Sequence, residues 1–408
     1  MPSECSARSR LTRRGLLAGG AAALAGAGAA GGAFAVGRDS PGPRPLADGE
    51  VGQRTVPFHG LRQAGVETPA QAFATFVGFD VRSGADREAL IRWMKLWTGD
   101  AERLTDGRPA LADTDPELAV APASLTITVG VGRGFLAAAG RLALAPAWLR
   151  PLPAFSVDAL EERWSGGDVV VQVCADDQVA VSHAVRMLSK DARAFATVRW
   201  VQQGFLHAPG AVPRGRTPRN LMGQLDGTAN PPPGSDEFSR VVWIDDGPSW
   251  LRHGTSLVLR RIRIEAEQWD KASRQGKEET VGRRLDNGAP LTGDAEHDEP
   301  DFEADNEIGL PVIPPWSHIR RARPNDARQR IMRRPYNYDD GPGQDGRPDI
   351  GLLFASYQAD VDAQFVPIQR RLDELDMLND YTTPIGSAVV AVLPGVAEGG
   401  WFGEALLS

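Results

Sequence analysis

The order in which the apolar pattern changes between residues 76 and 203 constrains the fold of this chain most strongly. Strand-like segments have period-two or β-branched patterns, and helical segments repeat at i, i+3, i+4 and i+7. In chain order the segments are strand 76–81, helix 86–97, strand 125–131, strand 169–174, helix 177–190 and strand 197–203. This is the β-α-β-β-α-β order of a ferredoxin-like unit.

A second set of such segments occupies the C-terminal part of the chain. The predicted elements are strand 256–264, a largely helical segment 265–284, strand 328–336, strand 350–357, helix 361–376 and strand 387–393. We therefore predict an α+β fold of two ferredoxin-like (βαββαβ) domains with antiparallel sheets, at 57–215 and 216–408. Two such sheets packed face to face would leave a buried cleft between sheet and helices. The element order carries this prediction, because no sequence repeat relates the two halves.

The first 35 residues have the layout of an export signal. A basic start precedes a Gly/Ala-rich apolar run and a small-residue cleavage site, and Thr12–Leu17 is similar to a twin-arginine signal. A disordered basic N-terminus with Ala-rich helix propensity is the alternative. We expect a signal peptide at 1–35, a Pro/Gly-rich linker at 36–56 and no membrane span in the mature chain. The location would then be extracellular, periplasmic or in the cell envelope.

Seven arginines between Arg320 and Arg334 stand out in a chain whose formal net charge is −8. Such a run is typical of nucleic-acid binding, but an acidic exported protein is a poor candidate for it. A solvated basic face is the plain alternative. Our hypothesis is that the run pairs with a small buried anion, because burying a carboxylate requires cations or hydrogen-bond donors.

The six histidines contain neither a His-x-x-x-His nor a Glu-x-x-His pattern, so a metal site built from protein ligands alone is poorly supported. A metal that arrives with four ligands of its own needs only one from the protein, and haem is that case. Spacing alone does not separate the histidines. His318 is the preferred candidate because the arginines that follow could pair with the two haem propionates.

Residues 220–231 form the second candidate segment. By default Asp226-Gly227 predicts a turn. However, Gly223 and Gly227 would let the backbone approach a flat ligand closely and hold Asp226 over its face.

Six short motifs, in order along the chain, together resemble those of dye-decolourising peroxidases. The twin-arginine-exported branch is the most similar, and it includes the deferrochelatase/peroxidase of bacterial iron-uptake systems. The motifs are Pro57–Pro69, Gly223–Thr228, Ser317–Arg320, Met332–Tyr338, Gly351–Phe354 and Thr383–Gly386.

The resemblance implies haem b in the C-terminal domain. By position, His318 matches the proximal iron ligand, Asp226 the distal carboxylate and Arg333 the distal arginine. The residues that match haem-lining segments are Gly227, Thr228, Ala229, Arg323, Pro324 and Asn325. One departure is Pro335, which stands where a glycine is common and has no N–H. It therefore opens the question of how the backbone beside Arg333 is hydrogen-bonded.

The expected activity is a haem b peroxidase that uses hydrogen peroxide to oxidise dyes, phenolics or other one-electron donors. Asp226 would move the peroxide proton, and Arg333 would stabilise the negative charge that develops as the O–O bond breaks. Bulky dyes should deliver electrons through surface Trp or Tyr. The alternatives are a deferrochelatase that releases iron from haem and a haem carrier. An iron-transport protein and a second copy of the chain are further candidate partners, and nucleic acid is not expected.

Overall fold

The computed structural model describes residues 50–408, apart from residues 214, 325, 327 and 344. The predicted signal peptide at 1–35 and residues 36–49 of the predicted linker therefore lie outside the described residues. In the described part of the chain, none of the helices has the length and apolar character needed to cross a membrane.

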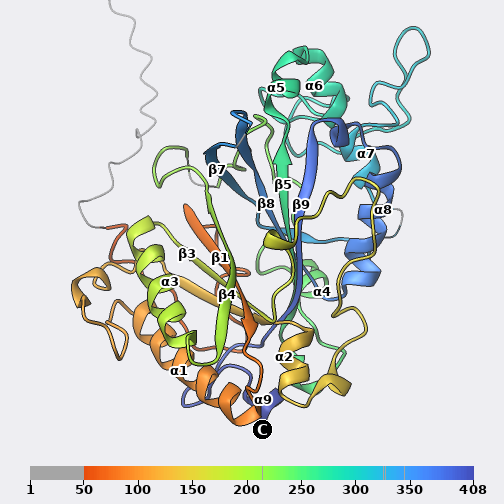
Figure 1. The fold of residues 1–408 in the computed structure, drawn as a ribbon. Helices are drawn as coiled ribbons and strands as arrows, with labels where there is room; N and C mark the ends of the chain where they lie inside the picture. The colour runs from red at the N-terminus through yellow and green to blue at the C-terminus, as the bar shows by residue number, and fades with distance from the viewer. Residues whose placement is uncertain (1–49, 214, 325, 327, 344) are drawn as a thin grey trace, which may run out of the picture. The chain divides into compact units, whose positions relative to one another are not determined.

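The N-terminal half contains the predicted order of strands and helices. The elements are β1 (Phe73–Val81), α1 (Arg87–Thr105), β2 (Thr126–Val131), α2 (Arg133–Ala138), β3 (Val169–Ala175), α3 (Gln178–Ala192) and β4 (Ala196–Phe205). The strands pair antiparallel in the order β2-β3-β1-β4. Helices α1 and α3 lie along one face of this sheet (Figure 1).

Helix α1 shows how the sequence encodes this layer. The side chain of Asp86 accepts a hydrogen bond from Ala89 N at 2.9 Å and begins the helix as its N-cap. Trp93 and Trp97 are fully buried against the sheet, one turn apart on the same face. Burying one large apolar side chain contributes about 1.5–3 kcal/mol, so this stripe fixes the helix on the sheet.

The C-terminal half contains a second antiparallel sheet, in the order β7-β8-β5-β9. Its strands are β5 (Thr255–Ile264), β6 (Met332–Arg333), β7 (Tyr336–Pro342), β8 (Pro348–Gln358) and β9 (Thr382–Val392). Its helices are α4 (Asp236–Val242), α5 (Ala266–Lys271), α6 (Arg274–Val281), α7 (His318–Ala322), α8 (Val366–Leu375) and α9 (Glu404–Leu407).

Three elements of this half differ in detail from the prediction. The helical segment 265–284 is two helices, because the Ser273 side chain accepts from Gly276 N at 3.0 Å and starts α6 as a new helix. The strand predicted at 328–336 is reduced to β6 and the start of β7, with Arg334 and Pro335 between them. The helix predicted at 361–376 begins with a π-helical turn that precedes α8.

The two sheets join edge to edge as well as facing each other. Strand β2 pairs with β9 at two positions, and β4 pairs with β7 at one, Phe205 with Asn337. Since β5 also pairs with β8, the strands close into a ring. Its interior is filled from both sheets, by side chains that include Phe76, Trp200, Tyr336 and Tyr357. Within the described residues the two halves therefore form one compact unit.

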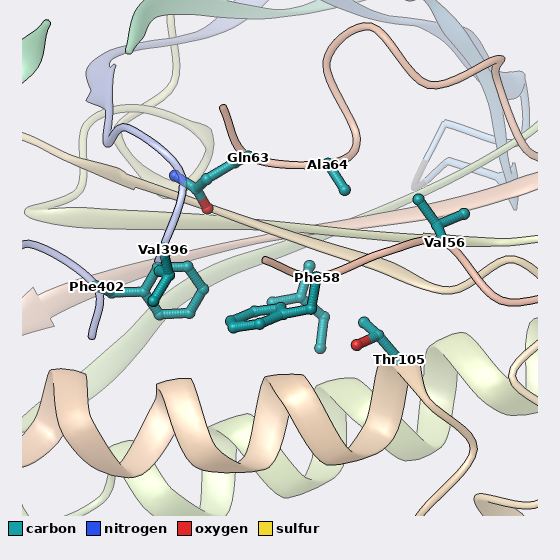
Figure 2. A pocket seen from close by; sticks show the side chains of 8 residues that line it. Val56, Phe58, Gln63, Ala64, Thr105, Val396 and Phe402 are labelled. Carbon is teal, nitrogen blue, oxygen red and sulfur yellow. The ribbon is translucent and has the colours of Figure 1, made fainter. Parts of the chain in front are cut away.

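Gln63 reinforces the short seam between β2 and β9. Its side-chain amide donates to Val129 O and to Leu393 O, each at 2.8 Å, and its oxygen accepts from Val129 N at 2.8 Å. Figure 2 shows Gln63, Phe58 and Phe402 among the side chains that line a small pocket. The volume of this pocket is about 10 Å³. This space is about the size of one water molecule.

Candidate functional site

The segment from Arg219 to Asn230 follows the connection between the two halves and carries Asp226. Gly223 has φ of 81° and Gly227 has φ of 132°, backbone conformations that favour glycine and turn the chain on either side of Asp226. Asp226 N donates to Pro218 O at 2.9 Å. A turn begins one residue after Asp226, since Asn230 N donates to Gly227 O at 2.9 Å, and 10% of the Asp226 side chain is accessible.

Asp226 and Arg333 form an ion pair although they are far apart in the sequence. Arg333 Nη1 lies 2.8 Å from Asp226 Oδ1. The pair is not aligned as a hydrogen bond, so Asp226 Oδ1 is a buried acceptor with no donor among the described residues. An unused acceptor beside a guanidinium, of which 24% of the side chain is accessible, is available to a ligand with a proton to donate.

His318 is the first residue of α7 and is oriented by a carboxylate. Its Nδ1 atom lies 2.6 Å from Oδ2 of Asp376, whose side chain is 3% accessible. Burial acts to lower the pKa of His318, but the charge and hydrogen bond of Asp376 outweigh it, and the pKa is raised overall. With Nδ1 paired to Asp376, the other ring nitrogen, Nε2, is left for a ligand.

The charges of Asp226 and Arg333 both act on His318. The positive charge of Arg333 acts to lower the pKa of His318, and the negative charge of Asp226 acts to raise it. His318 keeps 27% of its side chain accessible although its surroundings desolvate it. The structure thus places the charges of Asp226 and Arg333 near the partly accessible imidazole of His318.

Glu296 and Glu299, in one acidic loop, contact the segments that are predicted to line a haem. Glu296 Oε1 accepts from Thr228 Oγ1 at 2.9 Å and from Thr217 Oγ1 at 2.5 Å. Glu299 pairs with Arg323. The loop therefore contacts both predicted lining segments, the one that begins at Gly227 and continues through Ala229 and the one that contains Pro324. Asn325 lies outside the described residues.

The partners of the arginine run are oxygen atoms of the protein, which the sequence did not predict. Each of its seven guanidinium groups contacts a protein oxygen, so the run mainly ties segments of the chain together. The partners are Phe302 O and Ile313 O for Arg320, Arg371 O and Glu374 for Arg321, Glu299 for Arg323, Asp326 for Arg328, Glu237 and Ala229 O for Arg330, Asp226 for Arg333, and Thr68 O and Gln71 for Arg334.

A different guanidinium is better suited to bind an anion. Arg371 Nη2 is buried without a hydrogen-bond partner among the described residues, while Nη1 donates to Gln329 Oε1 at 2.8 Å. Arg321 and Arg371 also donate to each other's backbone oxygens, at 3.0 and 3.2 Å. From the sequence, Arg371 is placed only on the face of a helix, because the 50 positions between Arg321 and Arg371 hide their contact.

Three other site residues were not found from the sequence. Asp376 holds His318, Glu296 holds Thr228, and Asn230 makes two hydrogen bonds to the backbone of Arg333. Asn230 lies inside residues 220–231, the second candidate segment, so its position in the sequence pointed to the site. Asp376 and Glu296 belong to acidic stretches in which no pattern separates them from solvent-exposed neighbours.

The His318 imidazole is partly accessible, has a carboxylate on one nitrogen and lies near two opposite charges, those of Asp226 and Arg333. Such a site suits a metal cofactor that needs one protein ligand and a polar group above it. Together with two ferredoxin-like units, this is the architecture of a haem enzyme.

Comparison with known families identifies the chain more closely. The family described as "Dyp-type peroxidase, N-terminal" matches residues 63–206, and "Dyp-type peroxidase, C-terminal" matches residues 217–397. The chain belongs to the Dyp-type peroxidase family. It is therefore an enzyme of a haem-dependent peroxidase family, as the motifs predicted.

Individual relatives agree with this assignment. A protein named dye-decolorizing peroxidase from Thermobifida fusca is 40% identical over 97% of both chains. A protein named deferrochelatase from Escherichia coli is 37% identical over 86% of this chain and 87% of its own. The crystal structure of a DyP-type peroxidase from Cellulomonas bogoriensis is 53% identical, with a TM-score of 0.86 over 88% of this chain and 99% of that chain.

Proposed function

We propose that this protein is a haem b peroxidase in which His318 ligates the iron through Nε2, with Asp226 and Arg333 acting on the peroxide. The observation that carries the proposal is geometric: Asp226 and Arg333 form an ion pair at 2.8 Å, and the contact of His318 Nδ1 with Asp376 leaves Nε2 for a ligand. The donor set fits the cofactor: one free imidazole nitrogen for the iron, and a free Arg371 N–H for a carboxylate.

The bound haem iron supplies the redox chemistry of peroxide cleavage. Asp226 accepts a proton from the inner oxygen of hydrogen peroxide and returns it to the outer oxygen, so that water can leave. Its unpartnered Oδ1 atom is available for this transfer. Arg333 donates hydrogen bonds to the oxygen on which negative charge develops. Asp376 keeps the His318 Nδ1 proton in a strong hydrogen bond, which makes the imidazole a more electron-rich ligand.

The reducing substrates follow from the same proposal. We expect small phenolics, dyes and other one-electron donors, with bulky donors oxidised at the protein surface. Trp316 is the candidate for that role, because 40% of it is exposed and it lies two residues before His318.

Deferrochelation is the second candidate activity, and the name of the Escherichia coli relative favours it. It predicts that free protoporphyrin accumulates after haem loading without peroxide. Peroxidase activity instead predicts donor oxidation with the porphyrin still carrying its iron. Fluorescence of free protoporphyrin, measured alongside donor oxidation, separates the two.

Export is also part of the proposal. Residues 1–35 would direct twin-arginine export of the folded, haem-loaded protein, residues 36–56 would link the signal to the body, and the domains would span 57–215 and 216–408. An iron-transport partner and a homodimer are further proposals.

The decisive experiment is haem titration of His318→Gly, with and without added imidazole. We expect wild-type protein to give the absorption spectrum of an imidazole-ligated haem that changes with peroxide. His318→Gly should lose that spectrum and regain it when imidazole is added. The matched control is His207→Gly, because His207 is exposed on the surface. An unchanged spectrum in His318→Gly without imidazole would show that another residue binds the iron.

A further inference from the structure

The side-chain amide of Asn230 makes two hydrogen bonds to the backbone of Arg333, one as donor and one as acceptor. Its Nδ2 atom donates to Arg333 O at 2.7 Å, and its Oδ1 atom accepts from Arg333 N at 2.9 Å. Two such bonds to one residue are what a neighbouring strand provides in a sheet.

The need for this contact follows from the position of β6. This strand contains only Met332 and Arg333 and lies at the end of the strand order, next to β8. The N–H of the next residue, Arg334, faces β8 and donates to Ala355 O at 2.8 Å. Pro335 has no N–H. The backbone of Arg333 thus has no strand on its outer side, and Asn230 supplies the two missing hydrogen bonds.

The Asn230–Arg333 contact also gives Asp226 and Arg333 a second connection, besides their ion pair. Asp226 and Asn230 lie in one short segment, and Arg333 is held by both: through its side chain at Asp226 Oδ1, 2.8 Å away, and through its backbone at Asn230. The segment itself is braced, since Thr228 donates to Glu296 at 2.9 Å and Ala229 O accepts from Arg330 at 3.0 Å.

We propose that Asn230 is a positioning residue that sets the distance and direction between the Asp226 carboxylate and the Arg333 guanidinium. This role rests on the proposed function, because it matters for catalysis only if the two groups act on one peroxide. Asn230 acts through Arg333 and does not touch the substrate. It also answers the question raised by Pro335: a side chain, not the following peptide, satisfies the backbone at Arg333.

The test compares Asn230→Ala and Asn230→Asp with Asn306→Ala. Asn306 is the matched control, because its oxygen also accepts two backbone N–H groups, from Ile308 and Leu310, in an exposed turn. Asn230→Asp keeps the acceptor for Arg333 N and loses the donor for Arg333 O. It provides a second variant if alanine impairs folding.

The first measurement is hydrogen–deuterium exchange of the Arg333 amide in haem-free protein, which needs no activity. We expect Asn230→Ala to exchange faster by about tenfold or more, because loss of one backbone hydrogen bond is worth about that factor. Asn230→Asp should exchange at nearly the wild-type rate, and Asn306→Ala should not differ from wild type.

The second measurement is the affinity of the haem-loaded ferric protein for cyanide, together with the rate of its reaction with peroxide. Misplacement of a catalytic pair by about 1 Å can cost about 100-fold, so we expect Asn230→Ala to lose about 10- to 100-fold in both. Asn230→Asp should lose less than Asn230→Ala, since the Arg333 N–H bond survives.

Two results would overturn the positioning role. In the first, Arg333 exchanges no faster in Asn230→Ala. In the second, exchange is faster but cyanide affinity and peroxide rate stay at wild-type values. A failure of the proposed function is distinguishable, because it appears as wild-type peroxide reactivity of Arg333→Leu, whereas amide exchange reads the backbone contact directly.

Discussion

His318 Nδ1 and Asp376 Oδ2 lie 2.6 Å apart, although 58 residues separate them in the sequence. Asp376 is itself fixed, because its other oxygen accepts from Leu378 N at 3.0 Å in the turn that follows α8. The carboxylate therefore holds the imidazole in one orientation and one tautomer. This arrangement makes a histidine a stronger metal ligand than it would be alone.

The first prediction concerns this carboxylate. Asp376→Asn should weaken haem binding by about 10- to 100-fold and raise the reduction potential of the iron, because the imidazole donates less electron density. Haem transfer to an apo-acceptor and spectroelectrochemical titration measure the two effects. Asp373→Asn is the control, since Asp373 binds Ser156 and Val157 instead. Equal haem loss from both variants would remove Asp376 from this role.

The second prediction concerns the ion pair. Asp226→Asn should slow the reaction with hydrogen peroxide by about 10²–10⁴-fold, because it removes the proton carrier. Arg333→Leu should slow it by about 10²–10³-fold, because it removes the stabilising donor. The double variant should be little slower than the worse single one, since paired groups act as a unit. Stopped-flow absorbance measures these rates.

The exposed carboxylate of Asp286 provides the control for this series. Asp286→Asn should react at the wild-type rate. Wild-type rates in both Asp226→Asn and Arg333→Leu would exclude the assignment of these two residues, even if haem binding at His318 holds.

The third prediction is a pH dependence far from the haem site. Burial, together with Asp100 on α1, raises the pKa of Asp191 on α3 from 3.8 to about 8. The folded protein then binds a proton that the unfolded chain has lost between these two values, so stability is full below pH 4 and falls as pH rises toward 8.

Asp191→Asn removes this titration. Its melting temperature should exceed that of wild type at pH 9 and approach it at pH 4, as scanning calorimetry across this range can measure. Asp106→Asn is the control, because Asp106 is exposed and its melting curve should follow wild type at every pH. A constant difference between Asp191→Asn and wild type across the range would contradict the pKa shift.

The fourth prediction concerns Gln63 at the β2–β9 seam. Gln63→Ala should lower the free energy of unfolding by about 2–4 kcal/mol, because the Val129 N–H and the Leu393 C=O lose their Gln63 partner, whereas Val129 O keeps a hydrogen bond from Leu393 N at 3.1 Å. Urea unfolding measures this change. Gln53→Ala should have almost no effect, since Gln53 makes one exposed bond, at 3.5 Å, to Val120 O. Similar midpoints for the two variants would show that the seam does not depend on Gln63.

The sequence predicted the parts of the fold that local patterns encode. The stripe that contains Trp93 and Trp97 and the β-branched pattern in residues 125–131 each match one element, and the order of elements predicted the two-sheet fold. Local patterns could not place Ser273, where a cap divides one predicted helix into two. They also gave no sign that the sheets close into a ring, because that depends on brief pairings between distant edges.

Short motifs pointed to three residues of the candidate site. Asp226, His318 and Arg333 were each proposed from the sequence, and the structure places their charges within range of one another. The pairing of the arginine run with protein oxygens was not predictable, because a sequence shows charge but not the carbonyl and carboxylate groups that lie beside it. Asp376 was not predicted either, because only the folded chain shows which of many acidic residues contacts the His318 imidazole.

Consecutive residues of an extended chain point in opposite directions, and Arg333 and Arg334 show what this means here. Arg333 reaches Asp226, whereas Arg334 is buried among oxygens of Thr68, Pro69 and Gln71 from the first half of the chain. A one-residue insertion or deletion in β6 would exchange their directions, and so would remove both the Arg333–Asp226 ion pair and the hydrogen bonds of Arg334 to the first half of the chain. Evolution of this enzyme should therefore accept substitutions around the doublet far more readily than changes in its length.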